Sequence, residues 1–218
     1  MSAIAPNLPT TFDPHRLGHR GAGPEAADYG PAPKRVVVGY GFWIFLLSDF
    51  VMFSGFFAAY AVLGHSTAGG PGPRELFDLH NVAVETACLL VSSFTCGMAS
   101  IAVDARKSAL AHFWLLLTAV LGLAFLTLEI REFAGLVAQG DGPQRSAFLS
   151  AFFSLVGCHG LHVSVGLLWL GTMVPQLLAR GFAPNLLRRF RCWSLFWHAL
   201  DIIWVAVFTV VYLIPGNP

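Results

Sequence analysis

Charged residues are scarce in this chain of 218 residues: Asp, Glu, Lys and Arg together make up 11%, and the formal net charge at pH 7 is +1. Hydrophobic residues make up 56%, and the mean hydropathy is +0.65. A composition this apolar excludes an ordinary soluble domain, and the lack of a basic stripe argues against a nucleic-acid partner. The composition therefore predicts an integral membrane protein.

Closely spaced cysteine pairs are absent as well. The four cysteines lie inside or at the edge of apolar runs: Cys88, Cys96, Cys158 and Cys192. Neither a disulfide framework nor a zinc site has this spacing. We expect these cysteines to pack as small side chains.

The first 33 residues lack the apolar run that a signal peptide needs. They are rich in proline and glycine and contain almost no large apolar side chains. Such a segment cannot bury enough surface to offset the entropy lost on ordering. We therefore predict that residues 1–35 form a disordered or loosely ordered tail.

The chain does contain five long apolar runs, each able to cross the roughly 30 Å hydrocarbon core of a bilayer. They fall at about 36–63, 82–103, 110–133, 147–178 and 193–214. Short connections separate them, and a basic loop with Arg188, Arg189 and Arg191 is expected before the last run. The predicted fold class is all-α, an integral membrane bundle of five transmembrane helices over residues 36–214.

The distribution of Lys and Arg predicts the orientation of this bundle. One side carries ten of them: Arg16, Arg20, Lys34, Arg35, Arg106, Lys107, Arg180, Arg188, Arg189 and Arg191. The other side carries three: Arg74, Arg131 and Arg145. Positively charged connections stay in the cytoplasm, so we predict a cytoplasmic N-terminal tail and a periplasmic C-terminus at Pro218.

Five polar side chains lie deep within the apolar runs and are candidate site residues: Asp49, His159, His162, His198 and Asp201. At a rise of about 1.5 Å per residue, the histidines of the fourth run and the His198–Asp201 pair reach the same level. Residues at i and i+3 share a helix face. We therefore predict a hydrogen-bonded cluster between the fourth and fifth helices, with Asp49 at a similar depth.

Three glutamates form a second candidate group nearer the outer face: Glu85, Glu129 and Glu132. Because Arg131 stands beside the last two, we expect Glu129 and Glu132 to face solvent or lipid headgroups. Four tryptophans near the ends of runs are interpreted as interfacial anchors: Trp43, Trp169, Trp193 and Trp197. The deeper Trp204 is expected to pack.

The chemistry of these residues leaves several hypotheses open. His162 and His198, at one depth, are a weak candidate for the pair of axial ligands of a haem. Cys158, His159 and His162 lie on differing faces, so they make a poor metal site. The histidines otherwise serve as hydrogen-bond partners between helices, and Asp49 is a carboxyl that we expect to be protonated for much of the time. No catalytic residue is indicated.

Four motifs, in order along the chain, resemble a known family. They are GFWIFLLSDFVMFSGFFAAY at 41–60, LEIREF at 128–133, GCHGLHV at 157–163 and FWHALDIIW at 196–204. This set is similar to subunit III of haem-copper terminal oxidases, and most similar to the five-span form of cytochrome bo-type ubiquinol oxidases. The resemblance covers residues 36–214. Asp49 stands where the cytochrome c branch commonly has Glu.

The resemblance implies an accessory, non-redox subunit of a proton-pumping quinol oxidase in a bacterial inner membrane. Haem and copper would then lie in subunit I, and the partners would be subunits I, II and IV together with phospholipid bound in a cleft between helices. Asp49 would influence the proton-uptake side, and Glu85, Glu129 and Glu132 would line the lipid cleft or pack helices. The alternative is a stand-alone transporter or proton channel that uses Asp49 and the histidine cluster.

Overall fold

The computed structural model describes residues 34–64, 66–70, 72, 76 and 78–214. The predicted tail lies outside these residues, except for Lys34 and Arg35, which already belong to the first helix. The structure below is that of the unit that begins at Lys34.

The described chain is helical and contains no strand. The helices, in order, are α1 (Lys34–Leu63), α3 (Leu79–Asp104), α4 (Ser108–Ala138), α5 (Ala147–Arg180) and α6 (Pro184–Val207), which continues into the π-helix η2 (Phe208–Leu213). Five segments are long and apolar enough to cross a membrane, the last comprising α6 and η2 together. The predicted fold class, an all-α bundle of five membrane-crossing helices, is confirmed.

The helix ends are set by local signals. Ser146 accepts a hydrogen bond from the backbone N–H of Leu149 at 3.1 Å and so caps the start of α5. Gly181 follows the end of α5 with φ of 58°, a conformation that glycine adopts without steric cost. These two signals determine where the 34-residue helix starts and stops.

Helix α6 begins nine residues earlier than predicted, at Pro184 rather than Trp193. Proline suits the first helical turn because its φ is already helical and its missing N–H would have no partner there. The three arginines therefore project from the first turns of α6 and do not form a loop. Arg189 donates to Gln176 at 3.0 Å, and Arg191 donates to Asp104 at 3.2 Å.

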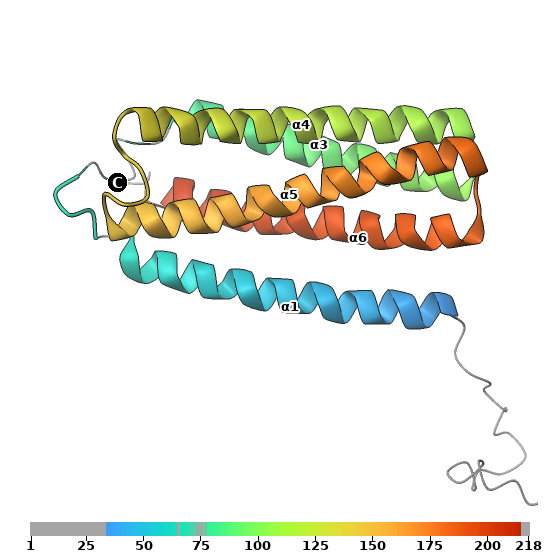
Figure 1. Cartoon of the computed structure of the whole chain (residues 1–218), viewed down its shortest axis with the longest axis horizontal. Helices are drawn as coiled ribbons and strands as arrows, with labels where there is room; N and C mark the ends of the chain where they lie inside the picture. Colours follow the sequence, from blue (N-terminus) through green and yellow to red (C-terminus); the bar gives the residue numbers. More distant parts are fainter. Residues whose placement is uncertain (1–33, 65, 71, 73–75, 77, 215–218) are drawn as a thin grey trace, which may run out of the picture. The chain divides into compact units, whose positions relative to one another are not determined.

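Helices α5 and α6 lie at the centre of the arrangement (Figure 1). Helix α1 packs on one side of this pair, and α3 and α4 pack on the other. The buried side chains of α1 recur every seven residues, at Leu46, Phe53 and Tyr60, which is the spacing of a narrow helix–helix seam. Most of the remaining surface of α1 is exposed.

Three tryptophans of α6 form the centre of the core, since Trp193, Trp197 and Trp204 are almost wholly buried. The expectation that Trp193 and Trp197 anchor at the membrane interface is therefore wrong. Their indole N–H groups bond inside the bundle: Trp193 donates to the Gly166 carbonyl at 2.9 Å, Trp197 to Ser92 Oγ at 3.1 Å and Trp204 to Thr86 Oγ1 at 3.1 Å. Each buried indole thus fixes α6 against another helix.

Candidate functional site

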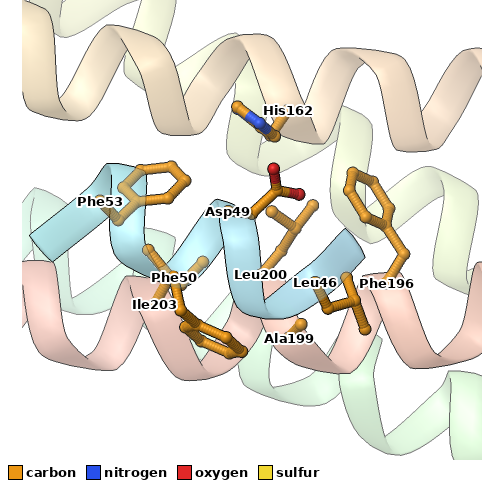
Figure 2. Close-up of a pocket in the computed structure, with 9 residues that line it drawn as sticks. All are labelled: Leu46, Asp49, Phe50, Phe53, His162, Phe196, Ala199, Leu200 and Ile203. Carbon is orange, nitrogen blue, oxygen red and sulfur yellow. The ribbon is translucent and has the colours of Figure 1, made fainter. Parts of the chain in front are cut away.

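Asp49 and His162 face one another across the seam between α1 and α5 (Figure 2). They line a narrow hollow whose other walls are apolar: Leu46, Phe50, Phe53, Phe196, Ala199, Leu200 and Ile203. Asp49 is half-buried, and the interaction between the two side chains is electrostatic. An acid and a base therefore meet within the membrane-crossing part of the bundle, where charge is costly.

The orientation of His162 is fixed from two sides. Its Nδ1–H donates to the backbone carbonyl of Cys158 at 2.7 Å, one helical turn earlier. Its ring lies 5.3 Å from the ring of Phe53, centre to centre. No hydrogen bond joins His162 directly to Asp49 among the bonds between described residues. Because Nδ1 is bonded to the Cys158 carbonyl, Nε2 is the ring nitrogen that remains for another partner.

His159 is fully buried in an aromatic environment. Its ring lies 5.1 Å from the ring of Trp204 and 5.8 Å from that of Phe125. Within the described part of the chain, neither ring nitrogen has a hydrogen-bond partner. His159 therefore packs with the core aromatics and does not join the predicted cluster.

His198 and Asp201 face α3 instead of α5. His198 Nδ1 lies 2.7 Å from Ser93 Oγ, and Ser93 also bonds to Asp201. The predicted cluster of these two residues with His159 and His162 is therefore wrong. The prediction rested on equal depth, but depth does not fix the rotation of each helix about its own axis, and here the rotations direct the two groups to different neighbours.

The same geometry contradicts the haem hypothesis. An axial pair needs two histidines that converge on one iron, but His162 faces α1 and His198 faces α3. Over the described ranges, no group of three or more His, Cys, Asp or Glu side chains could hold a metal ion.

The separation of His162 from His198 makes a testable prediction. Replacing both with alanine should change the free energy of unfolding by the sum of the two single effects, within about 0.5 kcal/mol, since residues without shared partners act additively. The measurement is thermal unfolding in detergent of the two single variants and the double variant. A coupling energy above about 1 kcal/mol would contradict the geometry.

The three glutamates lie inside the bundle. Glu85 is 1% exposed, Glu129 is 3% exposed, and Glu132 is partly buried. In each of them, Oε2 is enclosed and lacks a hydrogen bond to any described residue. The carboxyls are close enough to interact electrostatically, Glu85 with Glu132 and Glu129 with both. Three negative charges would be costly to hold here.

The expectation that Glu129 and Glu132 face solvent or headgroups is therefore wrong. Glu129 continues the inner stripe of α4, four positions after the buried Phe125, and its carboxyl lies against Gly160 of α5. A Cβ at position 160 would stand 2.7 Å from Glu129 Oε2. Arg131 is exposed because two positions along a helix turn the side chain by about 200°.

Two residues that sequence reasoning did not single out take part in these contacts. Ser93 joins His198 to Asp201, and Gly160 makes room for the Glu129 carboxyl. Ser93 carries no signal of its own in an apolar run. Gly160 lies between the two histidines of GCHGLHV, and this position in the motif could have indicated that it has a role in the contacts.

The fold and these contacts define a small multi-span membrane protein in which polar groups at mid-depth join helices. Residues 25–215 match the family described as "Cytochrome c oxidase subunit III". The chain belongs to that family, which confirms the resemblance seen in its motifs.

Individual relatives are similar over most of their length. The chain is 53% identical over 174 residues to "Cytochrome bo(3) ubiquinol oxidase subunit 3" of Pseudomonas aeruginosa, covering 80% of this chain and 83% of that protein. It is 50% identical over 174 residues to the protein of the same description from Pseudomonas putida, covering 80% and 84%. It is 43% identical over 175 residues to "Quinol oxidase subunit 3" of Bacillus subtilis, covering 79% and 85%.

Proposed function

We propose that this chain is the accessory third subunit of a quinol-oxidising, proton-pumping terminal oxidase, a complex that reduces oxygen to water. The observation that carries the proposal is 53% identity, over 80% of the chain, to a protein described as a cytochrome bo(3) ubiquinol oxidase subunit. The chain itself is non-redox, and haem and copper are held by the partner subunit I. The names of the relatives give no support to a stand-alone transporter or proton channel.

The proposed setting is a bacterial inner membrane, with oxidase subunits I, II and IV and phospholipids as neighbours. The surface of the bundle supports this, because side chains such as Val51, Phe94 and Leu168 are more than 60% exposed. Faces this apolar need lipid or other membrane helices against them. Glu85, Glu129 and Glu132 are assigned to helix packing, since they are enclosed between helices.

The proposal is tested by affinity purification of the chain in mild detergent. We expect a haem-containing subunit to co-purify in a fixed ratio, with quinol oxidase activity in the purified sample. Recovery of the folded chain alone, from cells that contain an active quinol oxidase, would contradict the proposal.

The orientation proposed above, with the N-terminus cytoplasmic and the C-terminus periplasmic, has its own test. A reporter that is active only in the cytoplasm should be active when fused before Met1 and inactive when fused after Pro218. A reporter that is active only in the periplasm should show the opposite result. Activity on the reversed sides would contradict the orientation.

Asp49 is assigned a tuning role in proton uptake by the complex. It reaches His162 but no further described carboxyl or histidine lines its hollow, so a continuous relay through this chain is not formed. Replacing Asp49 with asparagine removes the titratable group and keeps the shape. We expect Asp49→Asn to leave turnover largely intact while altering its pH dependence or its durability, as measured by quinol oxidase activity across a pH range.

Asp104→Asn, at the exposed end of α3, is the control; the contact of Asp104 with Arg191 is solvent-exposed and contributes about 1 kcal/mol or less, so the profile should be unchanged. A fall in turnover of about 100-fold or more with normal haem content would place Asp49 on an obligatory proton path, since removal of an essential acid–base group costs that much. A profile identical to wild type at every pH, with equal durability, would leave Asp49 a structural role only.

A further inference from the structure

A second hollow lies between α3 and α6, beside the contact of Ser93 with His198. It is an outward-opening groove of about 420 Å³. Its rim includes Leu90 and Phe94, of which Phe94 is 65% exposed. Gly97 lies in the groove, where a side chain at that position would meet nothing within 4 Å. The groove is therefore open space that this chain does not fill.

The polar residues that line the groove are Ser93, His198 and Asp201. Ser93 Oγ lies 2.7 Å from His198 Nδ1, and the tautomer of the imidazole decides which of the two atoms donates. In either tautomer the other ring nitrogen, Nε2, can form one further hydrogen bond. No bond between described residues uses that nitrogen. The groove thus offers a hydrogen-bonding nitrogen that has no partner among the described residues.

The depth of this nitrogen limits which molecules can reach it. His198 lies fourteen positions after the start of α6, and Ser93 lies eleven positions before the end of α3. At about 1.5 Å per residue, these polar residues are roughly 16 Å or more from the helix ends. Phospholipid headgroups stay outside a hydrocarbon core about 30 Å thick, so a phospholipid can place only its acyl chains at this level, and these form no hydrogen bond.

We infer that the α3–α6 groove is where a transmembrane helix of another subunit docks, presenting a hydrogen-bonding side chain to His198 Nε2. This inference rests on the proposed function, which supplies the partner subunits. Ser93 and Gly97 follow the small-xxx-small spacing that lets two helix backbones approach closely in lipid. The flanking Leu90 and Phe94 supply apolar walls for the docked helix.

Photocrosslinking of the assembled oxidase in its membrane tests the inference. Phe94 is replaced by p-benzoylphenylalanine, which resembles it in shape, and Leu123 is replaced likewise as the control. Leu123 is exposed at the middle of α4 and does not line the groove. We expect the probe at position 94 to capture a transmembrane peptide of another oxidase subunit at least tenfold more than the probe at position 123. Capture of lipid or quinol alone at position 94, or equal capture of the subunit at both positions, would overturn the inference.

A steric variant gives an independent measurement. Gly97→Leu adds a side chain in the groove, and Gly171→Leu adds the same side chain at an exposed glycine of α5; at both positions a Cβ meets nothing within 4 Å. We expect Gly97→Leu to reduce co-purification of the other subunits at least tenfold and Gly171→Leu to leave it unchanged. Normal co-purification with Gly97→Leu would overturn the inference. Failure of the wild-type chain to recover any partner would instead contradict the proposed function.

Discussion

Replacing Gly122 with leucine is expected to lower the free energy of unfolding by about 3 kcal/mol or more, an overpacking cost at the upper end of its usual range. A Cβ at position 122 would lie 2.8 Å from Cη2 of Trp197 and 3.1 Å from Cδ2 of Leu167. The indole cannot retreat, because its N–H is bonded to Ser92 and a Cβ on Gly166 would already stand 3.0 Å from its Cζ3. The measurement is the fraction of folded chain that remains in detergent after heating, determined by size-exclusion chromatography.

Gly135→Leu is the control, because it makes the same change on the same helix at a position where a Cβ meets nothing within 4 Å. It should be neutral or slightly stabilising, since leucine favours helix over glycine by roughly 1 kcal/mol or less. Equal stability of the two variants would show that Trp197 does not pack closely against α4.

Replacing Trp204 with alanine is expected to lower the free energy of unfolding by about 3–5 kcal/mol, the usual effect of truncating a large buried aromatic side chain. The indole is wholly buried, its ring lies 4.6 Å from that of Phe125, and its N–H donates to Thr86. Its removal leaves a cavity between α3, α4 and α6 and exposes one face of His159 to that cavity. Thermal unfolding of the purified variant in detergent measures the loss.

Trp43→Ala is the matched substitution on α1, where the tryptophan is 49% exposed. We expect it to change stability by about 0.5 kcal/mol or less, as surface substitutions do. If Trp204→Ala were as stable as Trp43→Ala, the central position of Trp204 in the core would be wrong.

The class of fold could be predicted from the sequence because a bilayer imposes it. In hydrocarbon every backbone N–H and C=O must be bonded within the segment, so an apolar run of sufficient length has to be a helix. All five predicted runs are helices in the structure. The resemblance to oxidase subunit III was also visible in the sequence, since its motifs lie in order along the chain.

The start of α6 could not be predicted from hydropathy. Residues 184–192 include three arginines, so their mean hydropathy suggests a loop. They are helical because Pro184 suits a helix start and because long arginine side chains can extend their charges away from the apolar surface.

The neighbours of the polar residues were decided by tertiary structure. Sequence position gave the depth of His162 and His198, and that information alone suggested a shared cluster. The rotation of each helix then placed Asp49 with His162, Ser93 with His198, and Glu129 against Gly160.

That rotation depends on packing contacts between residues far apart in the chain. Trp197 fits between α4 and α5 only where Gly122 and Gly166 leave room for its ring. The sequence by itself determined that there are five helices long and apolar enough to cross a membrane, and it predicted the depth of each polar group, because hydropathy and helical rise are properties of one segment. Only the tertiary structure decided which polar groups meet, because the rotation of a helix is set by the shapes of the side chains on its neighbours.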